Sequence, residues 1–202
     1  MERIIAYIDG YNLYHGLKSR GWKWAYWLNI HLMIENLLAP HQKLLLTKYF
    51  TTRVSEPEDK RLRQQKFLEA LGTIPEIKFF YGKYVPDDIT CRQCGHTYTT
   101  HHEKMTDVNI AVEMMTDALK DRFDIPVLVS GDSDLVNLVH RVKDLFSKKV
   151  IIVFPPKRKS KNLRRAANIV VDIDAQLLSK SLFPDEVIKP DGYTLKKPDK
   201  WQ

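Results

Sequence analysis

The sequence predicts a three-layer α/β fold in which a central, mainly parallel sheet of about five or six strands carries helices on both faces. Short apolar segments alternate along the chain with longer segments of helical periodicity. The apolar segments are too uniformly hydrophobic to have one solvated face, which is typical of parallel strands. With 202 residues, 44% of them hydrophobic, the chain is long enough for one domain with an ordinary core.

The first half of the chain supplies three of the expected strands and the helices between them. The best-defined helix has Ser55 in the N-cap position, Pro57 in the first turn and Gly72 at its end, which are residue types that favour these places. In order, the expected elements are a strand at 3–9, a helical region at 11–38 interrupted near Gly21, a strand at 43–52, a helix at 55–72 and a strand at 76–85.

The second half continues the alternation after a segment at 86–103 without regular pattern. Thr106 is the expected N-cap of the next helix. In order, the expected elements are a helix at 106–123, a strand at 126–131, a helix at 134–146, a strand at 148–154, a short helix near 161–167 and a strand at 168–173. We therefore expect one domain over residues 1–180, with a small Cys/His insertion at 86–103, and an extended tail over 181–202.

Composition and charge indicate a cytoplasmic protein with a polyanionic partner. No apolar run approaches the roughly 20 residues of a membrane span, and the sequence opens on a strand without the layout of a signal peptide. The chain has two cysteines, which excludes a disulfide framework. The net charge is +7, and residues 157–165 hold six basic residues and no acid. A basic surface of this kind favours nucleic acid.

Four aspartates are expected at the carboxyl edge of the sheet, where α/β proteins bind their ligands. Asp9 ends the first strand, and Asp107 lies in the first turn of the helix at 106–123. Asp132 and Asp134 follow the fourth strand. Any one of these has an ordinary explanation as a turn residue, an N-cap or a partner of a helix dipole. A helix needs one N-cap, however, so Asp132 in that role leaves Asp134 unexplained.

Crowded carboxylates repel one another unless a cation joins them. Hard oxygen ligands suit Mg²⁺ or Mn²⁺, which can activate water and neutralise charge on a phosphodiester. An acidic metal centre in a basic protein is the charge layout of a nuclease. Three polar side chains are expected nearby: Asn12, which could bind a metal-bound water or a phosphate or cap a helix; Ser130, a small hydroxyl; and Lys104, which could meet a phosphate, pair with Asp107 or form a surface salt bridge.

Three segments carry a resemblance to a known family: YIDGYNLYHGL (7–17), EKMTDVNIAVEMMTDAL (103–119) and VLVSGDSDLVNLV (127–139). They resemble the signature segments of the NYN domain, in its LabA-like branch of the PIN-like nucleases, and the match covers roughly residues 1–175. The resemblance implies a three-layer, Rossmann-like PIN fold and metal-dependent ribonuclease activity. It also implies metal ligands at Asp9, Asp107, Asp132 and Asp134, with a polar partner at Asn12.

The segment CRQCGHTYTTHHEK (91–104) indicates a structural zinc site. A CxxC followed by glycine directs two thiolates to one metal, and Zn²⁺ takes four ligands. The candidate ligands are Cys91, Cys94, His96, His101 and His102. The alternatives are a reduced thiol pair on a loop, or two ligands whose partners come from another chain. We expect this insertion to lie beside the acidic edge.

Basic and aromatic side chains supply a candidate surface for nucleic acid. The stretch RGWKWAYWLN (20–29) interleaves aromatic and basic residues, which can stack and hold single-stranded RNA. Core packing or a homodimer contact is the alternative use of these aromatics. The candidate phosphate-binding residues are Lys104, Lys157, Arg158, Lys159, Lys161, Arg164 and Arg165.

The leading hypothesis is a metal-dependent ribonuclease that acts on single-stranded or structured RNA. A non-cleaving RNA-binding or regulatory module on the same fold is the main alternative, because the basic and aromatic residues alone would suffice for it. A phosphatase of the haloacid dehalogenase type needs a second aspartate two residues after its nucleophile, where this chain has Tyr11. A nicotinamide-binding Rossmann protein needs a GxGxxG after the first strand, and the sequence has none there.

Overall fold

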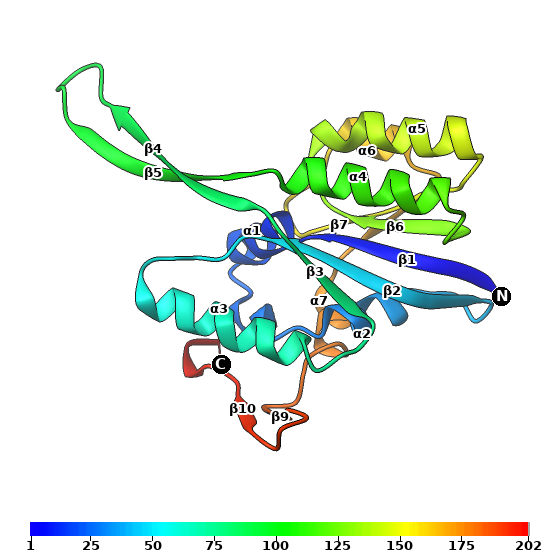
Figure 1. Ribbon diagram of the computed structural model, residues 1–202, viewed down its shortest axis with the longest axis horizontal. Helices are drawn as coiled ribbons and strands as arrows, with labels where there is room; N and C mark the ends of the chain where they lie inside the picture. The colour runs from blue at the N-terminus through cyan, green and yellow to red at the C-terminus, as the bar shows by residue number, and fades with distance from the viewer. Residues whose placement is uncertain (202) are drawn as a thin grey trace.

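The central sheet has six parallel strands, so the predicted fold class is confirmed (Figure 1). The computed structural model describes residues 1–201, and for residues 84–87 and 99–103 it describes the backbone alone. The strands lie in the order β3-β2-β1-β6-β7-β8. Their bounds are β1 Glu2–Asp9, β2 Gln42–Thr51, β3 Ile77–Tyr81, β6 Ile125–Val129, β7 Ile151–Phe154 and β8 Ile169–Asp172.

In this strand order, the direction in which successive strands are added to the sheet reverses between β1 and β6. The chain builds outward from β1 to one edge, returns, and builds outward from β6 to the other edge. Ile8 of β1 pairs with Val129 of β6, so the residues that follow these strands are neighbours at the carboxyl edge. Open α/β sheets bind their ligands at such a switch point.

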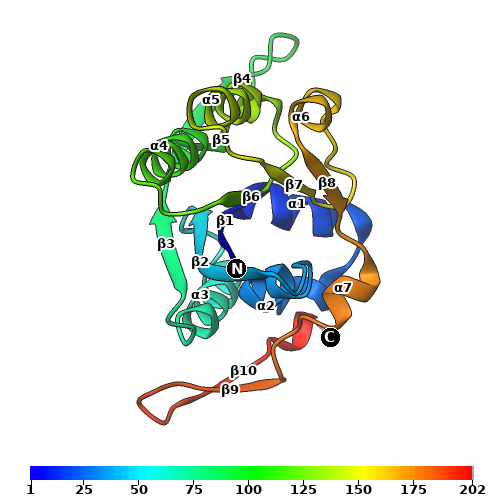
Figure 2. The same cartoon turned by 90° about the vertical axis from the view of Figure 1, so that its right-hand side faces the viewer.

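Helices cover both faces of the sheet, as Figure 2 shows end-on. Alternate side chains of β1 point to opposite layers: Ile4, Ala6 and Ile8 join one core cluster, and Ile5 and Tyr7 join the other. One layer holds α1 Gly10–Arg20, α2 Ile30–Glu35, α3 Glu58–Leu71 and α7 Ala175–Ser179, and the other holds α4 Thr106–Leu119, α5 Val136–Phe146 and α6 Lys161–Ala166. No helix within residues 1–201 is long and apolar enough to cross a membrane.

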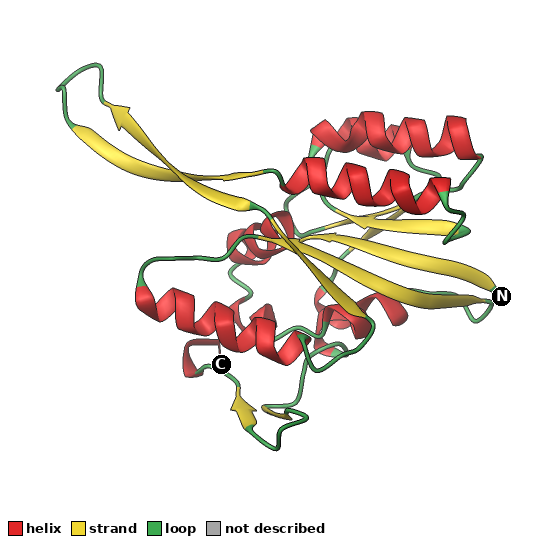
Figure 3. Ribbon diagram, viewed as in Figure 1, coloured by secondary structure: helices red, strands yellow, loops and turns green. Residues whose placement is uncertain are grey.

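The segment expected to be irregular forms an antiparallel hairpin instead. Strands β4 Lys83–Thr90 and β5 Thr97–Lys104 project away from the domain (Figure 3). The expected strand at 76–85 is therefore wrong in part, because it ends with β3 and a new strand begins after Gly82. A Cβ on Gly82 would lie 2.7 Å from the Lys104 carbonyl oxygen and 2.8 Å from Thr106 Oγ1. The missing side chain lets the two ends of the hairpin approach each other at its base.

Two expected N-caps differ from those in the structure. The carbonyl of Pro57, rather than of Ser55, accepts the first helical hydrogen bonds of α3, from the N–H groups of Lys60 and Arg61. The N-cap position of α4 is occupied by Met105, in the left-handed region at φ 77°, and Thr106 is the first residue of the helix. The helix expected at 134–146 opens with a 3₁₀ turn, Ser133–Leu135, before α5.

The C-terminal segment folds back on the domain rather than extending away from it. Strands β9 Glu186–Ile188 and β10 Thr194–Lys196 pair as a hairpin. A last 3₁₀ turn, Asp199–Trp201, carries Trp201 onto the rings of Tyr26, Trp27 and Phe67 at centroid distances of 5.7, 6.2 and 6.2 Å. Trp27 itself is fully buried, so part of the aromatic stretch at 20–29 serves the core.

A buried charge network fixes α4 on the sheet. The ammonium of Lys48 on β2 lies 2.6 Å from Glu113 and 2.6 Å from Asp117, both on α4. The Tyr7 hydroxyl donates to Asp117 at 2.6 Å, and Arg122 lies 3.0 Å from the same carboxylate. Burial by itself would raise the pKa of Asp117, but the hydrogen bonds from Lys48 and Tyr7 outweigh it and lower this pKa. The network thereby sets the position of the first turn of α4 as well.

Candidate active site

Asp9 is the last residue of β1, and its carboxylate caps the N-terminus of α1. Its Oδ1 accepts a hydrogen bond from the Asn12 N–H at 2.9 Å, and its Oδ2 accepts one from the Ser130 hydroxyl at 2.8 Å. The residue is only 2% exposed. Burial raises the pKa of Asp9 and the charge of Asp132 adds to the rise, whereas the hydrogen bonds oppose it. Two fixed donors therefore hold this carboxylate in one orientation at the sheet edge.

Asn12 and Ser130 join the two chain segments that meet there. The Asn12 side-chain oxygen accepts a hydrogen bond from the Gly131 N–H at 3.3 Å. The Ser130 hydroxyl, besides donating to Asp9, accepts from the Asp132 N–H at 3.0 Å. Ser130 is fully buried and Asn12 is 7% exposed. These contacts lock the start of α1 to the loop that leads from β6 into α5.

Asp132 and Asp134 have different environments. Asp132 caps the turn before α5, because its Oδ1 accepts from the Asp134 N–H at 3.0 Å. Asp134 is exposed. Asp134 thus takes part in the cap only through its backbone N–H. Its carboxylate is left free to add negative charge to the carboxyl edge of the sheet.

Asp107 lies in the first turn of α4, where the charges of the other three aspartates act on its carboxylate. Burial raises the pKa of Asp107 to about 6, and the negative charges of Asp9, Asp132 and Asp134 contribute to the rise. The structure therefore brings four acidic side chains from β1, α4 and the β6–α5 junction into one electrostatically coupled region. We call these four residues the acidic cluster.

Replacing Asp107 by asparagine is expected to stabilise the metal-free protein. The unfolded chain ionises this group near pH 3.8 and the folded protein near pH 6, so ionisation destabilises the folded state above that window. The melting temperature should rise by a few degrees at about pH 7.5 and change little at about pH 4. Differential scanning calorimetry in EDTA measures this. An equal rise for Asp144→Asn, which removes an exposed carboxylate late in α5, would contradict the account.

The donor set of the acidic cluster, four carboxylates, fits a hard divalent cation. Carboxylate oxygens suit Mg²⁺ or Mn²⁺, and the mutual repulsion seen at Asp107 is what such a cation would relieve. Within the described side chains, no three His, Cys, Asp or Glu groups already stand close enough to enclose an ion. Magnesium commonly binds through one or two carboxylates and keeps several waters, so a closed cage is not required.

The basic loop, which we define as residues 157–165 and which runs into α6, lies against the β6–α5 junction. A Cβ on Gly131 would lie 2.3 Å from the Arg158 carbonyl oxygen, so glycine is required for this approach. Burial lowers the pKa of His15 on α1, and the positive charges of Arg158 and Lys18 lower it further. The loop therefore reaches both the β6–α5 junction and α1.

The basic residues of this loop have unequal surroundings. Lys159 and Arg164 lie 2.8 and 3.7 Å from the carboxylate of Asp172 and are partly neutralised by it. Three others, Lys157, Lys161 and Arg165, are exposed. Lys104 is also exposed, at the base of the hairpin next to the start of α4.

The cysteines lie at the tip of the β4–β5 hairpin, which projects away from the domain, and only its base adjoins the start of α4 (Figure 1). The Cys91 N–H donates to the His96 carbonyl at 2.8 Å, and the Gly95 N–H donates to the Cys91 carbonyl at 2.9 Å. The side chains of His101 and His102 lie outside the described part of the structure. The backbone register places these two opposite Pro86 and Val85. His101 and His102 are four and five residues along β5 from Thr97, so their backbones lie roughly 13 Å or more from the tip.

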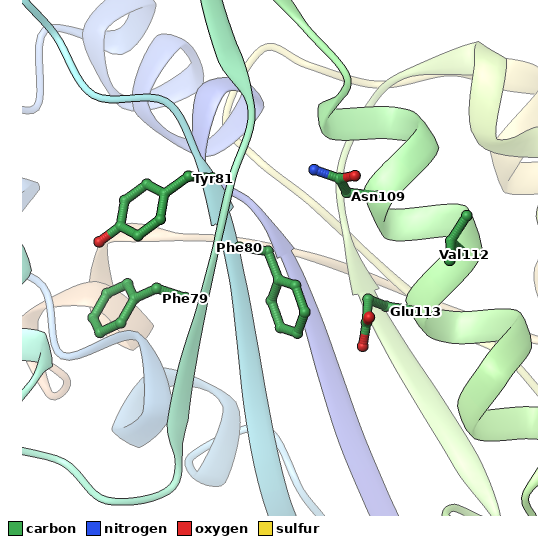
Figure 4. Close-up of a pocket in the computed structure, with 6 residues that line it drawn as sticks. All are labelled: Phe79, Phe80, Tyr81, Asn109, Val112 and Glu113. Carbon is green, nitrogen blue, oxygen red and sulfur yellow. The ribbon is translucent and has the colours of Figure 1, made fainter.

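Two hollows in the structure were not foreseen from the sequence. A small pocket of about 240 Å³ lies between the edge strand β3 and α4. Figure 4 shows Phe80 pointing into it toward Glu113, while Phe79 and Tyr81 point to the other side of β3. A much larger cavity of about 830 Å³ begins at Gly10 and Tyr11, directly after Asp9. The exposed tyrosines at i and i+3 on α1, Tyr11 and Tyr14, were the available signal for it.

Comparison with known proteins gives one family and two individual relatives. A crystal structure of a protein of unknown function, VPA0982 from Vibrio parahaemolyticus RIMD 2210633, superposes with a TM-score of 0.61 at 21% identity. The superposition covers 90% of this chain and 96% of that one, which establishes a shared fold.

The second relative is 6-hydroxy-3-succinoylpyridine 3-monooxygenase HspA of Pseudomonas putida (strain DSM 28022 / S16), which is 26% identical. The alignment covers 79% of this chain but only 62% of the length of that protein. The sequence pattern of the NYN domain, by contrast, matches residues 3–174, from the first strand to the end of the sheet. The chain therefore belongs to the NYN domain family and has its PIN-like α/β fold.

Proposed function

We propose that residues 1–180 form a divalent-metal-dependent ribonuclease that hydrolyses RNA phosphodiester bonds at the acidic cluster. The observation that carries the proposal is the meeting of Asp9, Asp107 and the Asp132–Asp134 pair at the switch point of the sheet. Membership of the NYN family supports it, because NYN domains have the fold of PIN-like nucleases. The basic loop beside the cluster supports a polyanionic substrate.

In this mechanism carboxylates of the acidic cluster would hold Mg²⁺ or Mn²⁺. Such a cation would supply an activated water and neutralise charge on the phosphate. Asn12 and Ser130 orient Asp9 through the hydrogen bonds at 2.9 and 2.8 Å. The exposed cations of the basic loop, together with Lys104, bind the flanking phosphates of single-stranded or structured RNA. The proposed location of this activity is the cytoplasm.

A second candidate function is the oxygenation of a small aromatic compound. Two observations favour it: the aromatic-lined cavity of about 830 Å³ and the similarity to a protein named as a monooxygenase. The direct test is consumption of 6-hydroxy-3-succinoylpyridine under oxygen with a reduced flavin or nicotinamide as electron donor. Turnover of this compound without metal-stimulated RNA cleavage would replace the ribonuclease proposal.

The hairpin tip is proposed to bind a structural zinc ion through Cys91 and Cys94. Backbone N–H groups of Cys94 and Gln93 point at the Cys91 sulfur and lower its pKa, which favours the thiolate that binds metal. His96, exposed in the same turn, is a further candidate, and the two thiolates of a second copy of the chain would complete the four ligands. The proposed assembly is thus a homodimer joined at its hairpins.

Metal analysis tests the zinc site. Wild-type protein purified without added zinc should retain the metal, and Cys91→Ser should lose it together with the dimer. Lys83→Gln at the base of the same hairpin is the matched control and should keep both. Metal-free wild-type protein would rule this site out without affecting the ribonuclease proposal.

A further inference from the structure

The cavity of about 830 Å³ lies on the α1 and α3 side of the sheet. Its walls come from α1, the 3₁₀ turn Lys23–Tyr26, the end of β2, the start of α3 and the C-terminal turn. The volume is within the range of pockets that enclose whole small ligands. Because Gly10 and Tyr11 line it, a ligand in the cavity would lie at the start of α1, directly after Asp9.

The walls of the cavity present aromatic faces. Tyr11 and Tyr14 are 43% and 40% exposed, although both are large and partly apolar. The rings of Tyr14 and Tyr26 are 5.2 Å apart, and the ring of Tyr11 lies 4.1 Å from that of His15. Trp201 also lines the cavity and packs edge-on against Tyr26. Exposed aromatic faces of this kind stack with unpaired nucleobases.

The charge around the cavity is positive. Among its described lining residues one is acidic, Glu56, and five are basic: Lys18, Lys23, Lys60, Arg63 and Lys200. Arg63 and Lys200 lie 2.8 and 3.2 Å from Asp59, which partly neutralises them. Lys18, Lys23 and Lys60 are exposed. Aromatic faces with surrounding cations fit an aromatic ring that carries a phosphate, rather than a purely apolar ligand.

We infer that this cavity binds one unpaired nucleotide of the substrate, with its base against the rings of Tyr11, Tyr14 and Tyr26 and its phosphate toward the acidic cluster. The inference rests on the proposed ribonuclease function and gives it a substrate class, single-stranded RNA. A base-paired nucleotide is excluded from the cavity, because its base is already stacked within a duplex. The C-terminal turn belongs to the site, since Trp201 forms one wall of the cavity.

Titration with 5′-AMP in EDTA tests the inference without any cleavage. Binding should quench the tryptophan fluorescence, and Tyr14→Leu should weaken it about tenfold, as expected for loss of one base–aromatic stack. Tyr193→Leu, which removes an exposed tyrosine from the C-terminal hairpin outside the cavity, should bind as the wild type does. Tyr11→Leu supplies a second, independent variant, and each variant must keep the wild-type melting temperature within a few degrees.

Equal affinity for ribose 5-phosphate and 5′-AMP, or unchanged 5′-AMP affinity in both tyrosine variants, would overturn the inference. Binding of 6-hydroxy-3-succinoylpyridine in place of 5′-AMP would also overturn it. RNA cleavage by variants with unchanged affinity would leave the ribonuclease proposal standing without this pocket. Tyrosine-dependent 5′-AMP binding without any RNA cleavage would support the pocket and refute the ribonuclease.

Discussion

Asp9→Asn is expected to lower the rate of metal-stimulated RNA cleavage by about 10²–10³ or more, which is the scale of losing one central electrostatic contact in an active site. The substitution removes the negative charge that would bind the cation. It preserves the side-chain oxygen that accepts the Asn12 N–H, so the cap of α1 and the fold should remain. Cleavage of a labelled single-stranded oligonucleotide in Mg²⁺ or Mn²⁺, with circular dichroism as the check on folding, measures the effect.

Asp132→Asn should lower the rate of cleavage in the same way. The fold should again remain, because the amide oxygen of the new side chain can still accept the Asp134 N–H and cap the turn before α5. The matched control is Asp144→Asn, which removes an exposed carboxylate from the same helix at its far end and should leave the rate unchanged. Full activity in both Asp9→Asn and Asp132→Asn would refute the assignment of the acidic cluster.

The second large effect is expected on stability. Lys48→Met should lower the free energy of unfolding by about 3–5 kcal/mol, because it leaves the carboxylates of Glu113 and Asp117 without their shared buried cation. For a chain of this length the melting temperature should fall by roughly 10 °C. Chemical denaturation with urea gives the free energy directly.

The matched control uses the same substitution at an exposed ion pair. Lys196 lies 3.1 Å from Glu186, with both side chains more than half exposed, so Lys196→Met should cost less than about 1 kcal/mol. Equal losses for Lys48→Met and Lys196→Met would show that the buried network does not fix α4. Lys48→Met should also weaken metal binding, because the network that it disrupts positions α4, and α4 carries Asp107.

The features that could be predicted from the sequence are those set by hydrophobic pattern and strand direction. Uniformly apolar strands required a sheet covered on both faces, and all six are parallel. Strand direction then placed Asp9 and Ser130 together, although they are far apart in the chain, and they form a hydrogen bond at 2.8 Å.

The features that could not be predicted depend on contacts between distant segments. The sequence of the β4–β5 hairpin is largely polar and lacks the apolar alternation that marks a strand. Its start depends on Gly82, whose role appears only when Lys104 and Thr106 lie beside it. The cavity likewise needs Trp201 to return to α1 and α3, and no local pattern specifies that return.

The most direct test of the central claim is a metal titration of RNA cleavage. Protein stripped of metal with EDTA is mixed with a 5′-labelled single-stranded RNA, and Mg²⁺ or Mn²⁺ is added back stepwise. The proposed function predicts no cleavage without metal and cleavage that rises and saturates as the cation is added. RNA that remains bound and intact at every metal concentration would contradict it and leave a non-cleaving RNA-binding module.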